Sequence, residues 1–122
     1  MKIKESAENY LETILMLSEK NSYVRSVDVA NELGFTKASV SVAMKAFRTE
    51  GYIINLDDGG IRLTEKGLAI AEKVRERHDV IAKVLIKLGV SEENAFTDSC
   101  KIEHDISEET FEKLKNFLNK RD

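Results

Sequence analysis

A cysteine, a glutamate and a histidine stand close together near the end of the chain, in the run Cys100-Lys101-Ile102-Glu103-His104. If this run is helical, Cys100, Glu103 and His104 share one face, because residues three and four apart are neighbours on a helix. Thiolate, carboxylate and imidazole groups are all ligands of transition metals. The chain has only one cysteine and two histidines, so this spacing indicates a metal site. The alternative is that Cys100 is a small buried apolar side chain, as free cysteines commonly are.

The composition predicts a helical protein that folds in a reducing compartment. Its 122 residues suffice for one domain or two small ones, and they include no proline, which favours long uninterrupted helices. A single cysteine excludes an internal disulfide framework. The first residues form an amphipathic stretch rather than an apolar signal sequence, and no apolar run is long enough to span a membrane. We therefore expect a soluble, cytoplasmic protein without a membrane partner.

Hydrophobic periodicity and turn residues divide the chain into helices and one hairpin. Strand-forming residues flank the run Asp57-Asp58-Gly59-Gly60, which is typical of turns. The expected elements are a helix capped by Ser6 and ended by Asn21-Ser22, helices at 27–33 and 37–50, strands at 52–56 and 61–64, and helices at 64–88, from 91 to about 104, and from 107 onward.

The order of these elements predicts a winged helix-turn-helix domain. Ser26 and Thr36 are suited to cap the second and third helices, and Gly34 and Gly51 to end them in the left-handed conformation. Two helices joined by a short glycine-containing turn form a helix-turn-helix unit. A hairpin directly after such a unit is a wing. We therefore expect a mainly α fold with a small β-wing, in which a winged-helix domain over residues 1–72 precedes a helical domain over 73–122.

The third helix has a basic face suited to DNA. Apolar residues recur on the side that should face the core, and the basic residues Lys37, Lys45 and Arg48 lie on the other, with no acid before Glu50. A recognition helix needs small residues that admit it to the major groove and basic residues that reach bases and phosphates. The alternative is an ordinary solvated helix face. The predicted DNA-contacting residues are Arg25, Thr36, Lys37, Ser39, Ser41, Lys45, Arg48, Arg62 and Lys66.

The chain resembles the diphtheria toxin repressor family of metal-dependent regulators, which includes the manganese transport regulators. The resemblance covers essentially the whole chain and rests on four motifs besides the order of elements: Glu8-Asn9-Tyr10-Leu11-Glu12, Leu63-Thr64-Glu65-Lys66-Gly67, Arg77-His78 and Cys100-x-x-Glu103-His104. It implies a homodimeric repressor that binds a divalent cation and then a double-stranded DNA operator, controlling metal uptake. It also implies that residues 73–122 form a dimerisation and metal-binding domain, in the short form without a third, SH3-like domain.

The resemblance also implies a set of metal ligands. They fall on Asn9, Glu12, His78, Cys100, Glu103 and His104. Asn9 departs from the family, which has methionine or a carboxylate at this position. The Cys100 thiolate favours iron(II), zinc, cobalt or nickel over manganese(II). We therefore expect iron(II) rather than manganese(II) as the activating metal, with zinc, cobalt and nickel able to bind in vitro.

Apolar residues of the last two helices predict a dimer. They are too many to be buried within so short a segment, and a two-fold dimer would cover them while spacing two recognition helices about one DNA turn apart. The residues expected to be covered in this way are Phe96, Phe111, Leu114, Phe117 and Leu118.

Three other functions compete with a metal-dependent repressor. The first is a winged-helix repressor whose metal site has degenerated, with Asn9 as the first sign. The second is a small metal-dependent hydrolase, which needs an open coordination position and a general base such as Glu12. The chain shows no oxyanion motif, so we expect no enzymatic activity and no small organic substrate. The third, a pure dimerisation module, leaves the basic helix face unexplained.

Overall fold

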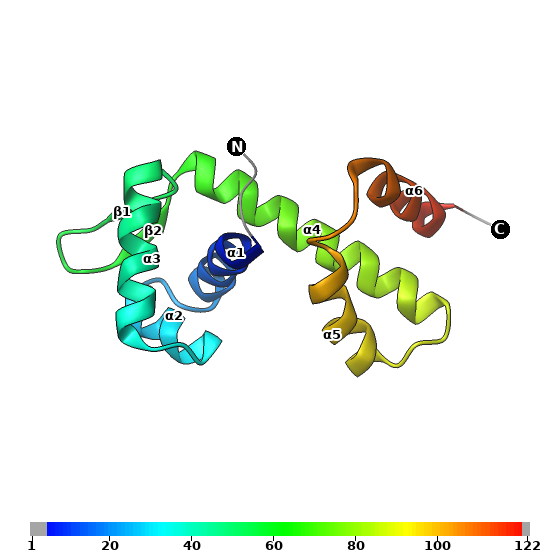
Figure 1. The fold of residues 1–122 in the computed structure, drawn as a ribbon, viewed down its shortest axis with the longest axis horizontal. Coiled ribbons are helices and arrows are strands. Elements are labelled where there is room, and N and C mark those ends of the chain that lie inside the picture. The colour runs from blue at the N-terminus through cyan, green and yellow to red at the C-terminus, as the bar shows by residue number, and fades with distance from the viewer. Residues whose placement is uncertain (1–4, 121–122) are drawn as a thin grey trace. The chain divides into compact units, whose positions relative to one another are not determined.

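The computed structural model describes residues 5–120, which form six helices and one two-stranded antiparallel sheet (Figure 1). The predicted fold class, mainly α with a small β-wing, is confirmed. The chain divides into two compact units, Met1–Glu72 and Lys73–Asp122. The elements are α1 (Glu5–Lys20), α2 (Ser26–Leu33), α3 (Lys37–Glu50), β1 (Ile53–Asn55), β2 (Ile61–Leu63), α4 (Glu65–Lys87), α5 (Glu92–Ile102) and α6 (Glu108–Asn119).

The first unit is built around one apolar core shared by α1, α2, α3 and the hairpin. Strands β1 and β2 pair with Ile54 opposite Arg62. The backbone N–H of Ile61 donates to the carbonyl of Val24 at 2.7 Å, which ties the hairpin to the segment before α2. The buried residues of this core are Tyr10, Leu11, Ile14, Leu15, Leu17, Val24, Val29, Ala30, Val40, Met44, Phe47, Ile53, Ile61 and Ala71.

The helix ends of the first unit follow the predicted capping residues in part. Thr36 accepts a hydrogen bond from the N–H of Ser39 at 3.1 Å, as an N-cap should. Gly34 and Gly51 both have positive φ, of 72° and 83°, at the ends of α2 and α3. The prediction that Ser6 caps the first helix is wrong, because α1 already includes Glu5 upstream of it.

Ser26 is also not a cap, since it is the first residue of α2. The N-cap is Arg25, whose backbone N–H donates to the Asp28 carboxylate at 2.9 Å. An aspartate in the first turn of a helix supplies both this hydrogen bond and a favourable charge for the helix dipole. The side chain that caps the start of α2 is therefore that of Asp28 and not that of Ser26.

The second unit packs the later part of α4 against α6. Its core consists of Val80, Val84 and Phe111, with Ile106, Leu114 and Leu118 packed against them. The expectation that a dimer partner covers Phe111 is therefore wrong, since this residue is buried within the chain. Phe111 is only 3% exposed, whereas Phe96 and Phe117 are 57% and 44% exposed.

Helix α5 ends slightly earlier than predicted. Its last residue is Ile102, and Glu103 is the C-cap, with its N–H donating to the carbonyl of Ser99 at 3.0 Å. Glu103 and His104 therefore lie at the start of the connection to α6 rather than inside a helix. Cys100 lies in the last turn of α5.

Candidate functional site

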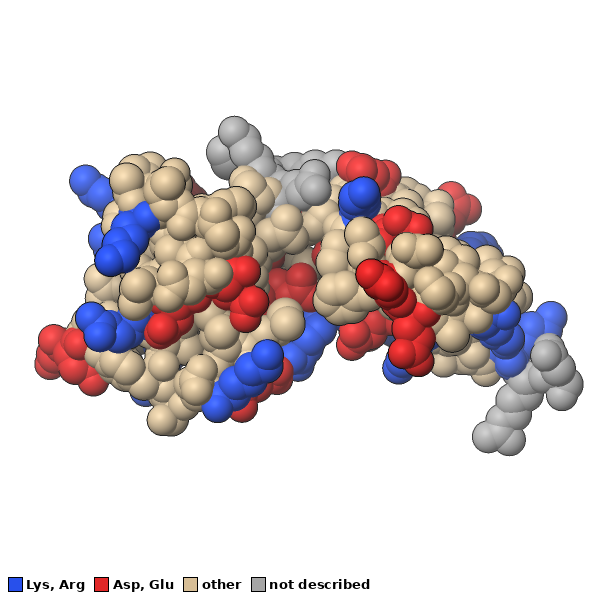
Figure 2. All heavy atoms as spheres, turned by 90° about the horizontal axis from the view of Figure 1, so that it is seen from below, with Lys and Arg blue, Asp and Glu red and all other residues tan. Residues whose placement is uncertain are grey.

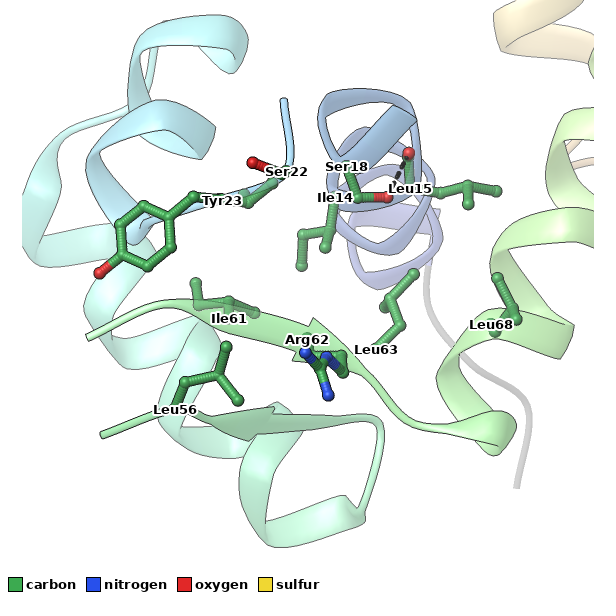
Figure 3. A pocket seen from close by; sticks show the side chains of 11 residues that line it. Ile14, Leu15, Ser18, Ser22, Tyr23, Leu56, Ile61, Arg62, Leu63 and Leu68 are labelled. Atoms are coloured by element: carbon green, nitrogen blue, oxygen red, sulfur yellow. Dashed lines mark hydrogen bonds between the residues drawn. The ribbon is translucent and has the colours of Figure 1, made fainter. Parts of the chain in front are cut away.

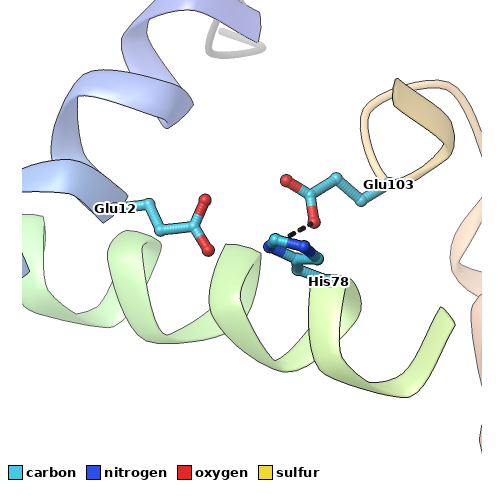
Figure 4. Close-up of side chains that lie close together, drawn as sticks. All are labelled: Glu12, His78 and Glu103. Carbon is cyan, nitrogen blue, oxygen red and sulfur yellow. Dashed lines mark ion pairs between the residues drawn. The ribbon is translucent and has the colours of Figure 1, made fainter. Parts of the chain in front are cut away.

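Four predicted metal ligands lie side by side in the second unit. His78 projects from α4, and its Nε2 is 3.4 Å from the Sγ of Cys100 on α5. The Nδ1 of His78 is 4.0 Å from Oε2 of Glu103, the pair joined by the dashed line in Figure 4. Oε1 of Glu103 is in turn 3.4 Å from Nε2 of His104. The structure thus brings together a thiol, two imidazoles and a carboxylate from two helices and the connection that follows them.

This cluster is largely shielded from water. Glu103 is 2% exposed, the His78 and His104 side chains are buried, and Cys100 is half-buried. An ionised carboxylate is costly to bury unless a cation or hydrogen bonds accompany it. Here Glu103 lies between two imidazoles, each of which is also a metal-binding group.

The donor atoms suit a transition metal in type, and two pairs of them have a spacing that a shared ion would allow. Bonds of about 2.0–2.3 Å to a tetrahedral ion place neighbouring donors roughly 3.3–3.8 Å apart. The distances from His78 Nε2 to Cys100 Sγ and from Glu103 Oε1 to His104 Nε2 are both 3.4 Å. Thiolate, imidazole and carboxylate together suit the later first-row divalent metals.

Two residues beside the cluster, Phe96 and Arg77, were noted in the sequence for other reasons and not as neighbours of the metal ligands. The ring of Phe96 packs against the imidazole of His78 at a tilt of 55°, with centroids 4.6 Å apart, although Phe96 itself is exposed. Arg77 donates from Nη1 to the backbone carbonyl of Glu103 at 2.9 Å. Contacts to a backbone carbonyl leave no side-chain pattern, so only the structure reveals them.

The remaining two predicted ligands, Asn9 and Glu12, belong to the first unit. They lie on α1 one turn apart, and Figure 4 shows the Glu12 carboxylate projecting from that helix. Asn9 is half-buried and Glu12 is buried. The two therefore share one face of α1, as their spacing predicts.

The recognition-helix candidate, α3, has the predicted division between core and solvent. Val40, Met44 and Phe47 are buried. The residues predicted to contact DNA are exposed: Lys37, Ser39, Ser41, Lys45 and Arg48. Val42, which the predicted set did not include, is 72% exposed on this outer side.

Of the other residues predicted to contact DNA, some have exposed side chains and others make hydrogen bonds within the protein. The Arg25 and Arg62 side chains are exposed before α2 and on β2. The Lys66 ammonium instead donates to the carbonyl of Glu50 at 2.9 Å and lies 4.7 Å from the centre of the Tyr52 ring, so it serves as a cap for α3. Thr36 is occupied as the N-cap of the same helix. Figure 2 shows basic and acidic side chains interspersed on one face, without a patch of a single sign.

A pocket of about 220 Å³ lies in the first unit between α1 and the hairpin (Figure 3). Its lining is mainly apolar, with Ile14, Leu56 and Leu63 facing inward and Arg62 at the hairpin side. It holds none of the predicted metal ligands. The metal cluster and this pocket are therefore separate features.

A winged helix followed by a helical unit with a cluster of metal-binding side chains defines a metal-dependent DNA-binding regulator. Residues 2–61 match the family described as iron dependent repressor, N-terminal DNA binding domain. Residues 64–122 match the iron dependent repressor, metal binding and dimerisation domain. The chain belongs to this family of metal-dependent repressors, and the resemblance inferred from its sequence is confirmed.

Relatives in sequence and in structure support the assignment. An uncharacterized HTH-type transcriptional regulator from Methanocaldococcus jannaschii is 35% identical over 120 residues, covering 97% of this chain and 96% of that protein. The transcriptional regulator MntR of Escherichia coli is 35% identical over 117 residues, covering 96% of this chain and 76% of the relative. The manganese regulator SloR, a solved structure, has a TM-score of 0.81 at 26% identity; it matches 98% of this chain, which spans 55% of SloR.

The function class follows from the family. The protein is a DNA-binding, metal-responsive transcriptional regulator of the repressor type, with a divalent metal as its cofactor. Its relatives are regulators, so a hydrolase is not favoured. Among residues 5–120, no helix is long and apolar enough to cross a membrane.

Proposed function

We propose that this protein is a cytoplasmic homodimeric repressor that binds a divalent cation and then its operator, shutting off genes for metal uptake. The observation that carries the proposal is the largely buried series of donor side chains His78, Cys100, Glu103 and His104, in which neighbouring pairs lie 3.4 to 4.0 Å apart. A repressor of uptake genes that requires the imported metal closes a feedback loop.

The proposed ligand set has two parts. His78, Cys100, Glu103 and His104 supply donors from the second unit, and Glu12, with Asn9, supplies donors from α1. Support for the second part is the residue type of Glu12 and the resemblance to the family. Asn9 offers a neutral amide oxygen, which binds a hard cation more weakly than a carboxylate would. The metal would supply a positive charge that holds these ligands together.

Charge explains why metal would act as a switch. Glu12, Glu103 and a Cys100 thiolate carry three negative charges, which repel one another and DNA when no cation is bound. A bound divalent cation offsets most of this charge. It would therefore favour the conformer in which the two units are held by shared ligands, and this conformer would bind the operator.

The choice of metal is a finer part of the proposal. We favour iron(II) over manganese(II), because thiolate is a softer ligand than the carboxylate or water that manganese(II) prefers. The relatives do not support this preference, since SloR is named a manganese regulator, while the family is described as iron dependent. Binding constants for iron(II) and manganese(II), measured anaerobically on the same preparation, would decide between them.

The proposed DNA surface is the outer side of α3 with basic residues around it. Exposure of Lys37, Ser41 and Lys45 suits contacts in the major groove, and Arg25 and Arg62 suit contacts with phosphates. The full proposed set is Arg25, Thr36, Lys37, Ser39, Ser41, Lys45, Arg48, Arg62 and Lys66. The hydrogen bond from Lys66 to the carbonyl of Glu50 uses one of its three N–H donors, so a phosphate contact remains compatible with the cap.

The proposed homodimer is supported by the exposed apolar side chains of the second unit. Ile86, Leu88, Phe96 and Phe117 are all exposed. An isologous dimer that covers them would remove apolar area from water and set the spacing of two recognition helices. Sedimentation at micromolar concentration, with and without metal, tests the dimer; a monomer in both states contradicts it.

One experiment tests the whole proposal. Binding to operator DNA is measured by gel shift for the parent, Cys100→Ala and His78→Ala proteins, in chelator and in iron(II) or manganese(II). We expect metal to tighten binding by the parent and to have little effect on either variant. Equal binding by chelated and metal-loaded parent protein would instead support a winged-helix repressor with a degenerate metal site.

A further inference from the structure

Arg77 precedes His78 on α4 and contacts the whole connection between α5 and α6. Its Nη1 donates to the backbone carbonyl of Glu103 at 2.9 Å and to that of Ile106 at 3.4 Å. Its Nη2 donates to Oε1 of Glu108, the first residue of α6, at 2.6 Å. The side chain is only 13% exposed. A single guanidinium thus joins α4 to both ends of this connection.

The Arg77 guanidinium lies where the end of α5 needs hydrogen-bond donors and positive charge. The last carbonyls of a helix have no intrahelical partner and carry partial negative charge, so a cation nearby is favourable. Glu103 is the C-cap of α5, and Arg77 donates to its carbonyl. A guanidinium presents its N–H donors in a rigid planar fork, so it fixes the orientation of its partners as well as their distance.

We propose that Arg77 is a positioning residue for the metal centre, which aims the Glu103 carboxylate toward His78 and keeps the His104 imidazole beside it by holding the backbone of Glu103. Arg77 and His78 are consecutive on α4, so one helical turn carries both a ligand and the anchor for two more. Partners that orient metal ligands typically change metal affinity by roughly 10- to 100-fold when they are removed. This role presupposes the proposed metal site.

The alternative is that Arg77 only stabilises the fold. A variant of Lys73 can distinguish this structural role from the positioning of metal ligands. Lys73 lies one turn before Arg77 on α4, and its ammonium is 2.9 Å from the same Glu108 oxygen. Both members of the Lys73–Glu108 pair are exposed, and exposed ion pairs contribute little to stability. Lys73→Met therefore weakens the same carboxylate pairing without removing the bonds from Arg77 to the connection, and is a matched control for Arg77→Lys.

The test measures cobalt(II) binding to the full chain without DNA. Arg77→Lys keeps the charge and most of the side chain but loses the fork. We expect it to bind cobalt(II) roughly 10- to 100-fold more weakly than the parent. Its visible absorption bands should also shift, because the ligands reach the ion in a changed geometry. Lys73→Met should match the parent in affinity and in spectrum, and circular dichroism should show all three proteins folded.

Several outcomes would overturn the proposal. Parent-like affinity and spectrum in Arg77→Lys would do so, as would an equal loss in Lys73→Met. If Arg77→Lys does not fold, Glu108→Ala replaces it, since that change removes the outer acceptor of the guanidinium. An unchanged spectrum and affinity then count against positioning. A weaker affinity with a shifted spectrum counts for it.

Failure of the proposed function looks different. In that case the parent itself binds no cobalt(II), or binding survives both His78→Ala and Cys100→Ala. If the parent binds cobalt(II) through those residues while Arg77→Lys is unchanged, only the role of Arg77 is wrong.

Discussion

At the scale of single residues, Cys100 is the side chain with the most influence on metal choice. Its Sγ is 3.4 Å from Nε2 of His78, and it is the only sulfur among the proposed donors. Cys100→Ser replaces a soft donor by a hard one of similar shape. We expect affinity for iron(II), cobalt(II) and zinc to fall at least about tenfold, or about 1.4 kcal/mol, and affinity for manganese(II) to fall less.

Calorimetric titration of each metal into the parent and Cys100→Ser measures this difference. An equal loss for all four metals would show that the thiolate does not set the preference. No loss for any of them would remove Cys100 from the ligand set.

Val42 gives a second prediction at this scale, on DNA reading. It is a β-branched residue that is 72% exposed on the outer side of α3, where contact between its apolar surface and water is unfavourable. In the major groove, an apolar side chain can contact the methyl group of thymine. Val42→Ala removes the equivalent of about two methylene groups from such a contact, or about 1.5 kcal/mol, so operator affinity should fall roughly tenfold.

The salt dependence of binding separates Val42 from the basic residues. An apolar contact releases no counterions, so Val42→Ala should leave the slope of log affinity against log salt unchanged. Lys45→Ala should lower that slope by about one if the ammonium contacts phosphate. Fluorescence anisotropy over a salt series measures both, and a parent-like operator affinity in Val42→Ala would exclude a base contact.

At the scale of elements, most helix ends could be predicted from local residues. Thr36, Gly34 and Gly51 were assigned correctly because a cap or a positive φ requires a particular residue type. Ser26 was not, because Asp28 supplies the hydrogen bond that caps α2. The burial of Phe111 was also missed, since it depends on packing against Val80 and Val84 of another helix.

The candidate site was predictable to a similar extent. The spacing of Cys100, Glu103 and His104 indicated a metal site, and the structure brings all three together with His78. The C-cap Glu103 keeps helical backbone angles, and its N–H donates to the carbonyl of Ser99, so the expected spacing holds for Cys100 and Glu103, whereas His104 lies beyond the helix. The connection to α6 holds Glu103 and His104 in place, because Arg77 donates to its backbone carbonyls. No sequence pattern predicts such contacts.

The junction between the wing and α4 yields a prediction about Gly67. The Oγ1 of Thr64 accepts from the N–H of Gly67 at 3.1 Å, and a Cβ on Gly67 would lie 2.1 Å from the carbonyl oxygen of Tyr52. A backbone atom cannot move away as a side chain can. Gly67→Ala should therefore destabilise the protein by about 1–3 kcal/mol.

Thermal unfolding of the metal-free protein measures this effect. Ala69→Ser, at an exposed position on the same helix, is the control and should stay within about 0.5 kcal/mol of the parent. A Gly67→Ala protein as stable as that control would show that the approach of Tyr52 is not a constraint.

The start of α6 adds a prediction on pH. Hydrogen bonds from Lys73 and Arg77 hold the pKa of Glu108 below its ordinary value of 4.5. Because the folded state favours the ionised form, this contribution to stability is present above pH 4.5 and is lost as the pH falls through the folded pKa. Glu108→Gln should lower the melting temperature at neutral pH by a small amount, since the pair is exposed, and the difference from the parent should vanish in acid.

Glu109→Gln is the matched control for this effect. Glu109 also lies in the first turn of α6, so its loss reports the helix dipole without the contacts to Lys73 and Arg77. A melting temperature that depends on pH equally in both variants would show that the ion pairs of Glu108 contribute nothing.

At the scale of the whole molecule, the proposed switch makes metal and DNA binding interdependent. If metal tightens operator binding by some factor, then operator DNA must tighten metal binding by the same factor, since both paths lead to the same complex. A typical coupling is about 1–3 kcal/mol, or roughly 5- to 150-fold. We expect a value in this range. Because cobalt(II) has an absorption spectrum, it allows both measurements on one sample.

Two titrations give the two factors: DNA into protein with and without cobalt(II), and cobalt(II) into protein with and without operator. Adding a non-operator duplex of equal length separates specific coupling from the attraction of any cation-bearing protein to phosphate. Glu12→Gln removes a charge from the first unit and leaves the cluster of the second unit intact. If Glu12 links the units through the metal, the variant should still bind cobalt(II), more weakly, but should lose most of the coupling. Full coupling in Glu12→Gln would mean that the metal acts within the second unit alone.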